Sequence, residues 1–368
     1  MENLSHFIVT FLVILTTSVL VCPVSCIRKN VGGATLFVFG DSLFDPGNNQ
    51  YRKGGTNDSS NNWPYGESYF KHATGRLSDG RLVPDFIAEF MKLPICIPYL
   101  RPGAHRFTQG ANFASAGAGV LVQTNPDTSI NLQLQLGYFK ELEKTLRQEL
   151  GVAETKKTFG RAIYLFSIGG NDYFNFYNKH PNSNQAQRTQ FLRMVIGNFT
   201  HVLKEVYEMG GRKFGFQNAG PLGCAPLMRA NNTKSPGHCI DEPSAMARLH
   251  NRALPKVLKD LQNKLPGFKY STFDYYNSLI DRIKNPSKYG LKEGKSACCG
   301  RGAYRAMLYS CGQGQLGKDY ELCSNPKEYV HFDCAHTTEA TNLQLAKLLW
   351  EGPPTVTSPL SLKDLLNS

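Results

Sequence analysis

Short apolar runs alternate along the chain with longer stretches whose apolar residues recur at helical spacing. The runs are rich in aromatic and β-branched residues, a composition that favours buried strands. The predicted strands are 35–39, 162–168, 213–217 and 270–273, with a short one near 107–113. The predicted helices are 84–91, 132–150, 191–209, 244–265 and 338–350. Regular alternation of strand and helix predicts an α/β fold, with a mostly parallel sheet covered by helices on both faces.

Two segments lack either periodicity. Residues 47–80 are rich in Asn, Gly and Ser and are expected to form a long ordered loop. The tail from about residue 352 is rich in Pro and Ser and is expected to be loose. No composition break or internal repeat divides the 368 residues, which suffice for one large α/β domain. We therefore expect a single domain over residues 27–368.

The first residues resemble a targeting signal. Residues 7–21 form a nearly unbroken apolar run, shorter than a membrane span requires, and small residues follow it at Val24 and Cys26. This pattern predicts a secretory signal peptide, residues 1–26, cleaved after Cys26. An uncleaved anchor is the alternative. We expect no stable membrane span in the mature chain and a secreted location, outside the cell or in the cell wall.

Cysteine usage fits the same compartment. Of ten cysteines, eight lie beyond residue 26, an even number that favours disulfides in an oxidising environment. Cys224 and Cys239 flank a short loop and are expected to close it. The four cysteines 298, 299, 311 and 323 are expected to form two bridges, with their pairing open. A zinc site is the disfavoured alternative, because these spacings do not match Cys-x2-Cys patterns. We expect no metal.

Glycosylation and charge extend this picture. Three sequons, at Asn57, Asn198 and Asn231, predict glycosylation in a secreted protein. The net charge is +12, and removal of the signal, with Glu2 as its only charged side chain, would make it +13. Such a charge favours contact with polyanionic wall material or lipid surfaces. Nucleic-acid binding is not expected, because the basic residues are scattered and form no recognition motif.

The string Gly40-Asp41-Ser42-Leu43 directly follows the first predicted strand. Gly40 permits a sharp turn, and Ser42 would then emerge at the carboxyl end of the sheet, where open α/β sheets bind ligands. Near the other end of the chain, Asp333 and His336 are three residues apart, so one loop can carry both. A serine hydroxyl needs an imidazole to take its proton and a carboxylate to orient that imidazole. The pattern predicts Ser42 as nucleophile, His336 as base and Asp333 as its orienting acid.

Acyl transfer also needs hydrogen-bond donors for the oxyanion. The backbone N–H of Ser42 is one candidate. Gly117 is a second, because a Gly-rich string at 110–119 lets the backbone approach closely. Asn171 is a third, because it follows a predicted strand end and would project at the same rim as Ser42. Ser115 is a rival nucleophile, but a Gly-x-Ser-x-Gly elbow is incomplete there because Phe113 occupies the first Gly position.

Several neighbours of these residues are expected to have supporting roles. The polar side chains expected to hold the nucleophile turn through bonds to the backbone are Asp41, Asp45, Asn48 and Asn49. Cys334, between acid and base, is expected to be disulfide-bonded or buried. His331 lies two residues before Asp333 and is expected to be a surface imidazole, with a position lining the cleft as the alternative.

Taken in order, these strings resemble the plant GDSL esterases/lipases of the SGNH hydrolase superfamily. The resemblance runs from about residue 35 to residue 350. The strings that carry it begin at Gly40, Asn112, Gly169, Asn218, Cys298 and Asp333. It implies a three-layer α/β/α sandwich of flavodoxin-like type. It also implies the triad Ser42, Asp333 and His336, an oxyanion hole with Gly117 and Asn171, and hydrolysis of carboxylic esters without a cofactor.

The chain departs from the family pattern beside the triad. His331-Phe332-Asp333 stands where the family often has Phe-Trp-Asp, and Thr337 stands where Pro or Asn often follows the histidine. These changes leave the triad intact and concern the choice of substrate. We expect a secreted serine esterase acting on acyl esters of lipids or secondary metabolites. One alternative is an acyltransferase that uses the same triad with an alcohol acceptor. Another is a catalytically silent defence or binding protein on this fold.

Overall fold

The computed structural model describes residues 33–52, 55, 59–104, 107–312 and 319–368, and the fold below belongs to the unit Ala34–Ser368. Its centre is a six-stranded sheet in the order β10-β5-β4-β3-β1-β2. The strands are β1 (Leu36–Gly40), β2 (Gly110–Asn112), β3 (Ile163–Ser167), β4 (Lys213–Gln217), β5 (Lys269–Phe273) and β10 (Thr357–Pro359). The first five are parallel, and only β10 pairs antiparallel, with β5. The predicted α/β fold with a mostly parallel sheet is confirmed.

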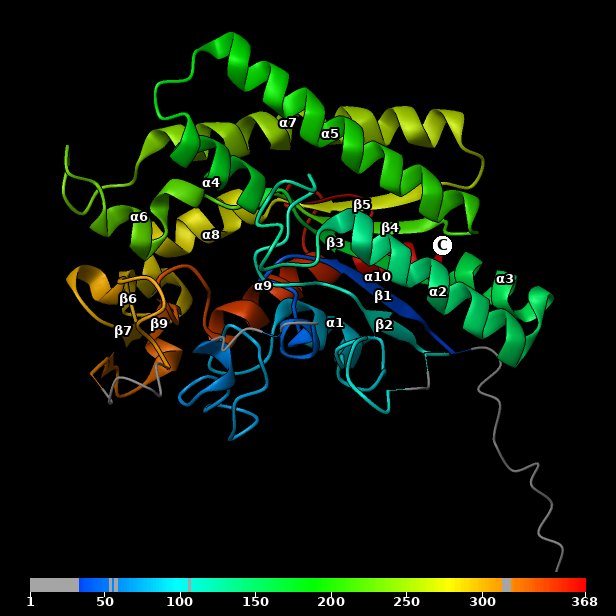
Figure 1. Cartoon of the computed structure of the whole chain (residues 1–368), viewed down its shortest axis with the longest axis horizontal. Helices are drawn as coiled ribbons and strands as arrows, with labels where there is room; N and C mark the ends of the chain where they lie inside the picture. Colours follow the sequence, from blue (N-terminus) through cyan, green and yellow to red (C-terminus); the bar gives the residue numbers. More distant parts are fainter. Residues whose placement is uncertain (1–32, 53–54, 56–58, 105–106, 313–318) are drawn as a thin grey trace, which may run out of the picture. The chain divides into compact units, whose positions relative to one another are not determined.

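Helices cover both faces of this sheet (Figure 1). The helices are α1 (Val83–Phe90), α2 (Leu132–Leu150), α3 (Val152–Arg161), α4 (Gly170–Lys179), α5 (Gln185–Glu208), α6 (Pro226–Ala230), α7 (Asp241–Lys264), α8 (Tyr275–Lys284), α9 (Glu339–Glu351) and α10 (Leu362–Asn367). One apolar core packs α2, α3, α5 and α7 on one face, and a second packs α1, α8, α9 and α10 on the other. The result is the three-layer α/β/α arrangement that the sequence predicts.

The alternation of side chains along the central strands builds these two cores. In β1, Phe37 and Phe39 belong to the first core, whereas Leu36 and Val38 belong to the second. β3 follows the same rule, because its residues in register with β1 point to the same faces. Fully buried strands on a two-faced sheet therefore appear in sequence as continuous apolar runs. This is why the runs predicted the strands so closely.

The strand order places a ligand site between β1 and β3. The order runs outward from β1 to β2 on one side and from β3 to β5 on the other, so the chain reverses direction across the sheet at this point. Loops that leave β1 and β3 at their carboxyl ends diverge there and form a crevice. Ser42 leaves β1 and Asn171 leaves β3 at this crevice.

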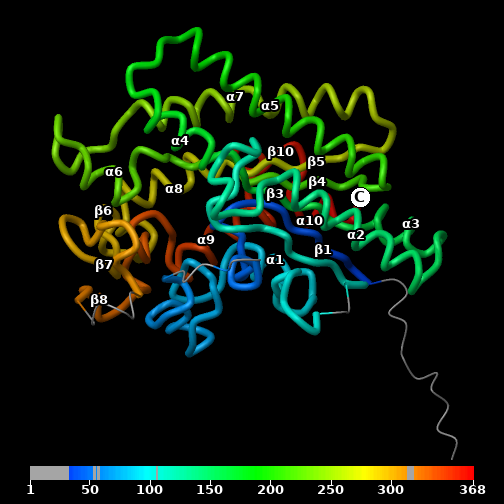
Figure 2. Tube along the Cα trace, viewed as in Figure 1, coloured from blue at the N-terminus to red at the C-terminus, as the bar shows by residue number. Residues whose placement is uncertain are grey.

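Two small sheets lie outside the central one. β6 (Glu293–Ala297) pairs in parallel with β9 (Tyr329–His331), and β7 (Cys299–Gly300) pairs antiparallel with β8 (Glu321–Leu322). These segments and the loop before α1 lie on the same side of the molecule in the trace (Figure 2). β9 leads directly into the segment that carries Asp333 and His336. The small sheets therefore position the second half of the predicted triad.

The tail after Gly352 is ordered, contrary to the expectation of a loose segment. Thr357–Pro359 adds an edge strand to β5, where a proline is tolerated because one side of the strand needs no partner. Ser361 then caps α10 by accepting a hydrogen bond from the backbone of Asp364. Leu362 and Leu365, three residues apart on α10, are fully buried in the second core. Pro359 lies in an edge strand and Ser361 caps a helix, so both residues belong to ordered elements of the tail.

No helix in the described part of the chain is long and apolar enough to cross a membrane. The predicted signal peptide, residues 1–26, lies outside the described residues.

Candidate active site

The nucleophile turn is held at the edge where β1 meets β3. A Cβ on Gly40 would lie 2.4 Å from the carbonyl oxygen of Ser167, so only glycine lets the end of β1 approach β3 this closely. Gln135 of α2 fixes the same residue from the other side, accepting from the Gly40 N–H at 2.9 Å and donating to its carbonyl at 2.8 Å. The Asp41 N–H then donates to the Ser167 carbonyl. Ser42 is thereby presented at the carboxyl end of the sheet.

Ser42, His336 and Asp333 form one hydrogen-bonded chain. The Ser42 Oγ lies 2.8 Å from the His336 Nε2. On the other side of the ring, the His336 Nδ1 lies 2.8 and 2.9 Å from the two carboxylate oxygens of Asp333. An imidazole that donates from Nδ1 to a carboxylate presents Nε2 as an acceptor, which is the form that a general base for a serine hydroxyl needs. The structure thus brings together three residues that span 294 positions of sequence.

The Asp333 carboxylate is buried but well supplied with donors. The backbone N–H groups of Ala335 and His336 both donate to its Oδ1, at 2.9 and 2.8 Å. The Tyr65 hydroxyl donates to its Oδ2 at 2.9 Å. Burial by itself would raise the pKa of Asp333, but the charge of His336 and the hydrogen bonds from residues 335 and 336 outweigh it and hold the pKa below its usual value. Asp333 therefore stays ionised and can hold the imidazole of His336.

Three N–H donors beside Ser42 are available to a ligand. Ser42, Gly117 and Asn171 all line the same cavity. Within the described residues, the backbone N–H groups of Ser42 and Gly117 make no hydrogen bond. The Asn171 amide donates one of its two N–H groups to the Ala118 carbonyl at 2.9 Å, which ties its side chain to the Gly117 loop. The three residues predicted to supply oxyanion donors therefore line one cavity and have spare donor capacity.

The loop that carries Gly117 is braced by polar side chains from the nucleophile segment. The Asp45 carboxylate accepts from the backbone of Gly47, Asn48 and Ala116 at 2.7 Å each. Asn48 donates to the carbonyls of residues 112 and 114, and Asn49 to that of residue 116. The expected bonds to the backbone around Ser42 are confirmed for Asp41 and Asp45, whereas Asn48 and Asn49 bond to the neighbouring loop at residues 112–116.

Ser115 belongs to this bracing, and neither hydrogen-bond partner of its hydroxyl is a histidine. Its side chain is fully buried, its Oγ donates to the Asn49 Oδ1 at 2.5 Å, and it accepts from the Ile130 N–H at 2.8 Å. Both roles of the hydroxyl are thus used inside the loop. This arrangement argues against the rival assignment of Ser115 as nucleophile.

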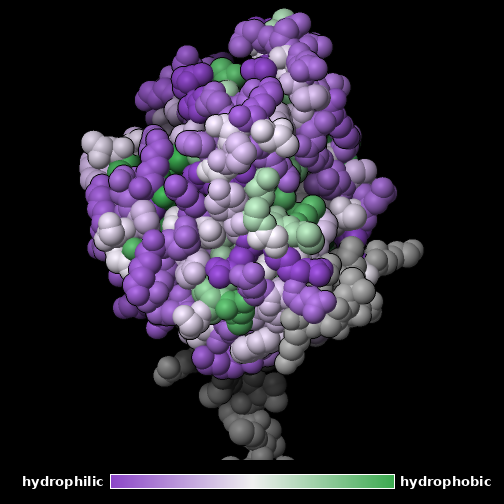
Figure 3. Space-filling view, turned by 90° about the vertical axis from the view of Figure 1, so that its left-hand side faces the viewer, coloured by the Kyte–Doolittle hydropathy of each residue, from purple (hydrophilic) through white to green (hydrophobic). Residues whose placement is uncertain are grey.

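The site opens into a cavity of about 1250 Å³. One wall is apolar and comes from α8 and the segment 222–228. The apolar residues of this wall are Leu222, Leu227, Met228, Leu279 and Ile283. The loop residues Met307, Leu308 and Tyr309 also line the cavity and are each about half exposed. Figure 3 shows the face to which the parallel strands point, where hydrophobic side chains gather in patches among hydrophilic ones. The volume exceeds that of most small-molecule sites, so the cavity can take an ester with an extended apolar part.

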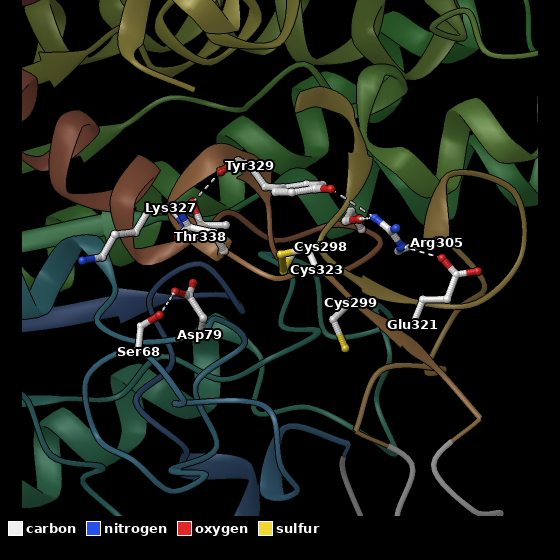
Figure 4. Close-up of a disulfide and its surroundings, with 12 residues drawn as sticks. Ser68, Asp79, Cys298, Cys299, Arg305, Glu321, Cys323, Lys327, Tyr329 and Thr338 are labelled. Carbon is white, nitrogen blue, oxygen red and sulfur yellow. Dashed lines mark hydrogen bonds and ion pairs between the residues drawn. A yellow bond between two sulfur atoms is a disulfide. The ribbon is translucent and has the colours of Figure 1, made fainter. Parts of the chain in front are cut away.

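Disulfides hold the loops around this cavity. Cys224 pairs with Cys239, Cys298 with Cys323, and Cys299 with Cys311. The expected closure of the first loop and the two expected bridges in the second are confirmed. Arg305 strengthens the second loop, because its guanidinium donates to Glu321 at 2.8 Å and to the Tyr329 hydroxyl at 3.4 Å (Figure 4). The half-exposed residues 307–309 are thus anchored to β9.

Two residues close to Asp333 in sequence, Cys334 and His331, differ in how well they match the sequence analysis. Cys334 is a buried free thiol, which agrees with the expectation that it is bonded or buried. His331 was expected at the surface, but only 2% of it is exposed, and it lines the cavity. The reason is that the end of β9 is covered on two sides, because the backbone of His331 pairs with Ala297 of β6 and with Thr337. The cleft-lining alternative is therefore correct for His331.

Two of the three sequons lie in the described residues. Asn198 is exposed on α5, and Asn231 is exposed directly after α6. Asn57 lies outside the described residues. Exposure makes both of the described asparagines accessible, and glycosylation at them stays a prediction.

The buried carboxyl of Asp41 is expected to make the free energy of unfolding depend on pH. Burial raises the pKa of this carboxyl to about 7, although the hydrogen bond from the Leu43 N–H and the charge of His336 oppose the change. Between the ordinary value of 3.8 and about 7, the folded protein holds a proton that the unfolded chain has lost. The contribution of Asp41 to stability therefore falls as pH rises through this window.

The Asp41→Asn variant is expected to lose this dependence while it keeps an oxygen that can accept from Leu43. Urea unfolding of wild type and variant at several pH values from about 4 to 8 measures the effect. We expect the variant to gain free energy of unfolding relative to wild type as pH rises. A difference that does not change with pH would contradict the buried, protonated state of Asp41.

Sequence reasoning missed two residues of this site. Tyr65 lies in the loop before α1, 268 positions from the Asp333 carboxylate to which it donates. No local pattern marks it, because a tyrosine in a polar loop resembles any other surface aromatic. Asp172 is the second, since its carboxylate accepts from the backbone of Val120 and Leu121 and from the Thr124 hydroxyl. Its position next to Asn171 was the only available signal.

Comparison with known proteins agrees with this geometry. The family model described as GDSL-like lipase/acylhydrolase matches residues 36–349. The chain is 45% identical to GDSL esterase/lipase 1 of Arabidopsis thaliana over 371 residues, which cover 99% of each chain. It is 46% identical to a GDSL lipase of Tanacetum cinerariifolium, over 96% of this chain and 93% of the relative. A relative at 38% identity, over 90% of this chain and 74% of its own length, is named an inactive GDSL esterase/lipase-like protein of Arabidopsis thaliana.

The match to the family model spans nearly the whole described fold, and the two relatives at 45–46% identity are named for ester hydrolysis. No observation favours the acyltransferase alternative. The chain therefore belongs to the GDSL lipase/acylhydrolase family and is a carboxylic ester hydrolase of the esterase/lipase type.

Proposed function

We propose that the chain is a secreted serine esterase in which Ser42, His336 and Asp333 act as the catalytic triad. The observation that carries this proposal is the continuous set of contacts from the Ser42 Oγ through both ring nitrogens of His336 to the Asp333 carboxylate. The three disulfides support secretion, because such bonds persist in oxidising compartments.

The proposed reaction has two halves. In the first, His336 Nε2 takes the proton of Ser42 as Oγ attacks the ester carbonyl. The tetrahedral oxyanion accepts hydrogen bonds from the N–H groups of Ser42, Gly117 and Asn171, and His336 returns the proton to the leaving alcohol. In the second half, water attacks the acyl carbon and His336 Nε2 takes its proton. The bond between that carbon and the Ser42 Oγ then breaks, His336 returns the proton to Oγ, and the acid leaves. Asp333 stays ionised throughout and stabilises the imidazolium.

The substrates proposed are acyl esters of lipids or secondary metabolites. The apolar wall formed by α8 and the segment 222–228 would accept the hydrocarbon part of the ester. Burial of that part away from water supplies binding energy in proportion to its apolar area. The high net positive charge of the chain would favour contact with acidic wall material or anionic lipid surfaces.

A fluorophosphonate probe tests the nucleophile without any mutation. Such probes form a covalent bond with an activated serine, so digestion of the labelled protein and mass spectrometry identify the serine that reacted. We expect the label on the peptide that contains Ser42 and none on the peptide that contains Ser115. Label on Ser115 would overturn the assignment of the nucleophile. No label on either would favour a silent protein, as the relative named inactive suggests is possible in this family.

A further inference from the structure

One polar side chain in the cavity takes no part in the proposed triad. His331 is the last residue of β9, and its backbone pairs with Ala297 of β6 and with Thr337. The side chain is almost completely buried, yet it lines the cavity that contains Ser42. The backbone of His331 is therefore fixed from both sides, which limits where its side chain can lie.

One ring nitrogen of His331 has no hydrogen-bond partner among the described residues. Its Nδ1 is buried and makes no hydrogen bond within the part of the chain that the structure describes. Buried polar atoms in folded proteins are nearly always paired, because an unpaired one loses its hydration without compensation. An imidazole that lines a substrate cavity and has an unpaired ring nitrogen is best explained by a partner that arrives with the ligand.

His331 is uncharged in this environment. Burial lowers its pKa to about 3, and the charge of Arg229 acts in the same direction, while Asp333 partly opposes both. A neutral imidazole carries one donor and one acceptor, and which nitrogen holds the proton depends on the tautomer. A hydroxyl group is the partner that suits either ring nitrogen in either tautomer, because it can both donate and accept.

His331 shares its cavity with apolar side chains and has charged groups close by. The same cavity is lined by Leu227, Met228, Leu279 and Ile283. Arg229 and Asp333 are near enough for their charges to act on the imidazole. A ligand that places only hydrocarbon beside His331 would leave the imidazole without a hydrogen bond. A ligand with one hydroxyl group beside His331 would supply that hydrogen bond.

We propose that His331 is a specificity-determining residue that hydrogen-bonds a hydroxyl group of the bound ester, so that the enzyme selects hydroxyl-bearing esters over plain alkyl esters. The inference rests on the proposed function, because it assigns the substrate class of the same cavity. The hydroxyl belongs either to the acyl part or to the alcohol part of the ester. His331 acts on binding and orientation, and His336 remains the base.

Matched ester pairs test the proposal. The acyl arm compares ethyl hexanoate with ethyl hexanoates hydroxylated at successive carbons, and the alcohol arm compares ethyl hexanoate with 2-hydroxyethyl hexanoate. The quantity measured is the ratio of kcat/KM for the hydroxylated ester to that for the plain ester, by titration of the released acid. We expect wild type to prefer at least one hydroxylated ester by about tenfold or more, since a site built to pair a hydroxyl rejects its analogue strongly.

The His331→Phe variant keeps an aromatic ring but removes both nitrogens, and we expect the ratio to fall at least about tenfold. His331→Gln retains a donor and an acceptor and is expected to keep part of the preference. His201→Phe makes the same chemical change on the exposed side of α5 and should leave the ratio as in wild type. Labelling of each variant at Ser42 by the fluorophosphonate probe reports whether its triad is assembled.

Two results would overturn the proposal. The first is a wild-type enzyme with no preference in either arm, which needs no variant. The second is a ratio that survives in His331→Phe. If the ratio survives while activity on both esters falls equally, His331 supports Asp333 and does not contact the substrate. Failure of the proposed function looks different, because wild type would then hydrolyse neither ester and would not be labelled at Ser42.

Discussion

Replacing Ser42 with alanine is expected to lower kcat on a short-chain aryl ester by about 10⁴- to 10⁶-fold, the range seen when a serine hydrolase loses its nucleophile. Ser42→Ala removes the hydroxyl whose Oγ lies 2.8 Å from the His336 Nε2, and with it the group that attacks the ester. Stopped or continuous assay of released phenol measures the loss. Residual turnover would reflect water attack aided by Gly117 and Asn171.

Comparing the losses of kcat in single and double variants tests whether Ser42 and His336 act together more sharply than the size of any one loss. His336→Ala should cost about as much as Ser42→Ala, and the double variant should cost little more than either, because the two groups act in one proton transfer. Additive losses would mean that they act independently.

Ser361→Ala is the matched control, because Ser361 caps α10 and lines no part of the cavity. We expect that variant to lose about 1 kcal/mol of stability and to retain its activity. A Ser42→Ala enzyme that kept more than a few per cent of wild-type kcat would exclude Ser42 as the nucleophile.

The parts of the site that sequence could predict depend on local order along the chain. Ser42 and Asn171 each follow a buried strand, and parallel strands end at one edge of the sheet, so their proximity follows once the strands are identified. Asp333 and His336 share one loop, so their contact needs only three residues of chain. In both cases the positions of the residues in the sequence already limit how far apart their side chains can lie.

The parts that sequence could not predict depend on the tertiary packing of distant segments. Whether His331 is buried depends on loops that cover β9, and Tyr65 reaches Asp333 only because the loop before α1 folds against β9. The ordered tail shows the same limit, because Leu362 and Leu365 are isolated apolar residues until the second core gives them a surface to cover. The composition of the loop at 47–80 and of the tail predicted polar segments, but composition does not indicate which distant residues pack against them.

Asp333→Asn is expected to lower kcat by about 10⁴-fold, because an amide can hold the ring of His336 only in the wrong tautomer and cannot stabilise an imidazolium. The backbone donors at residues 335 and 336 favour an acceptor oxygen on this side chain, so its amide nitrogen would be directed toward Nδ1 or toward Tyr65. Labelling at Ser42 should slow in parallel with turnover. Activity within about tenfold of wild type would remove Asp333 from the triad.

Tyr65→Phe tests how the Asp333 carboxylate is oriented without changing its charge. The substitution keeps the ring that packs edge-on against Phe332 at 5.3 Å and removes only the hydroxyl that donates to Oδ2. We expect a loss of about 10- to 100-fold in kcat, the equivalent of one hydrogen bond to a charged group. The freed carboxylate would also stabilise the imidazolium of His336 more strongly, so the acid limb of the pH profile of kcat/KM should move to higher pH. A purely structural role for Tyr65 would lower activity without that shift. The direction of the pH profile therefore decides whether Tyr65 acts through Asp333.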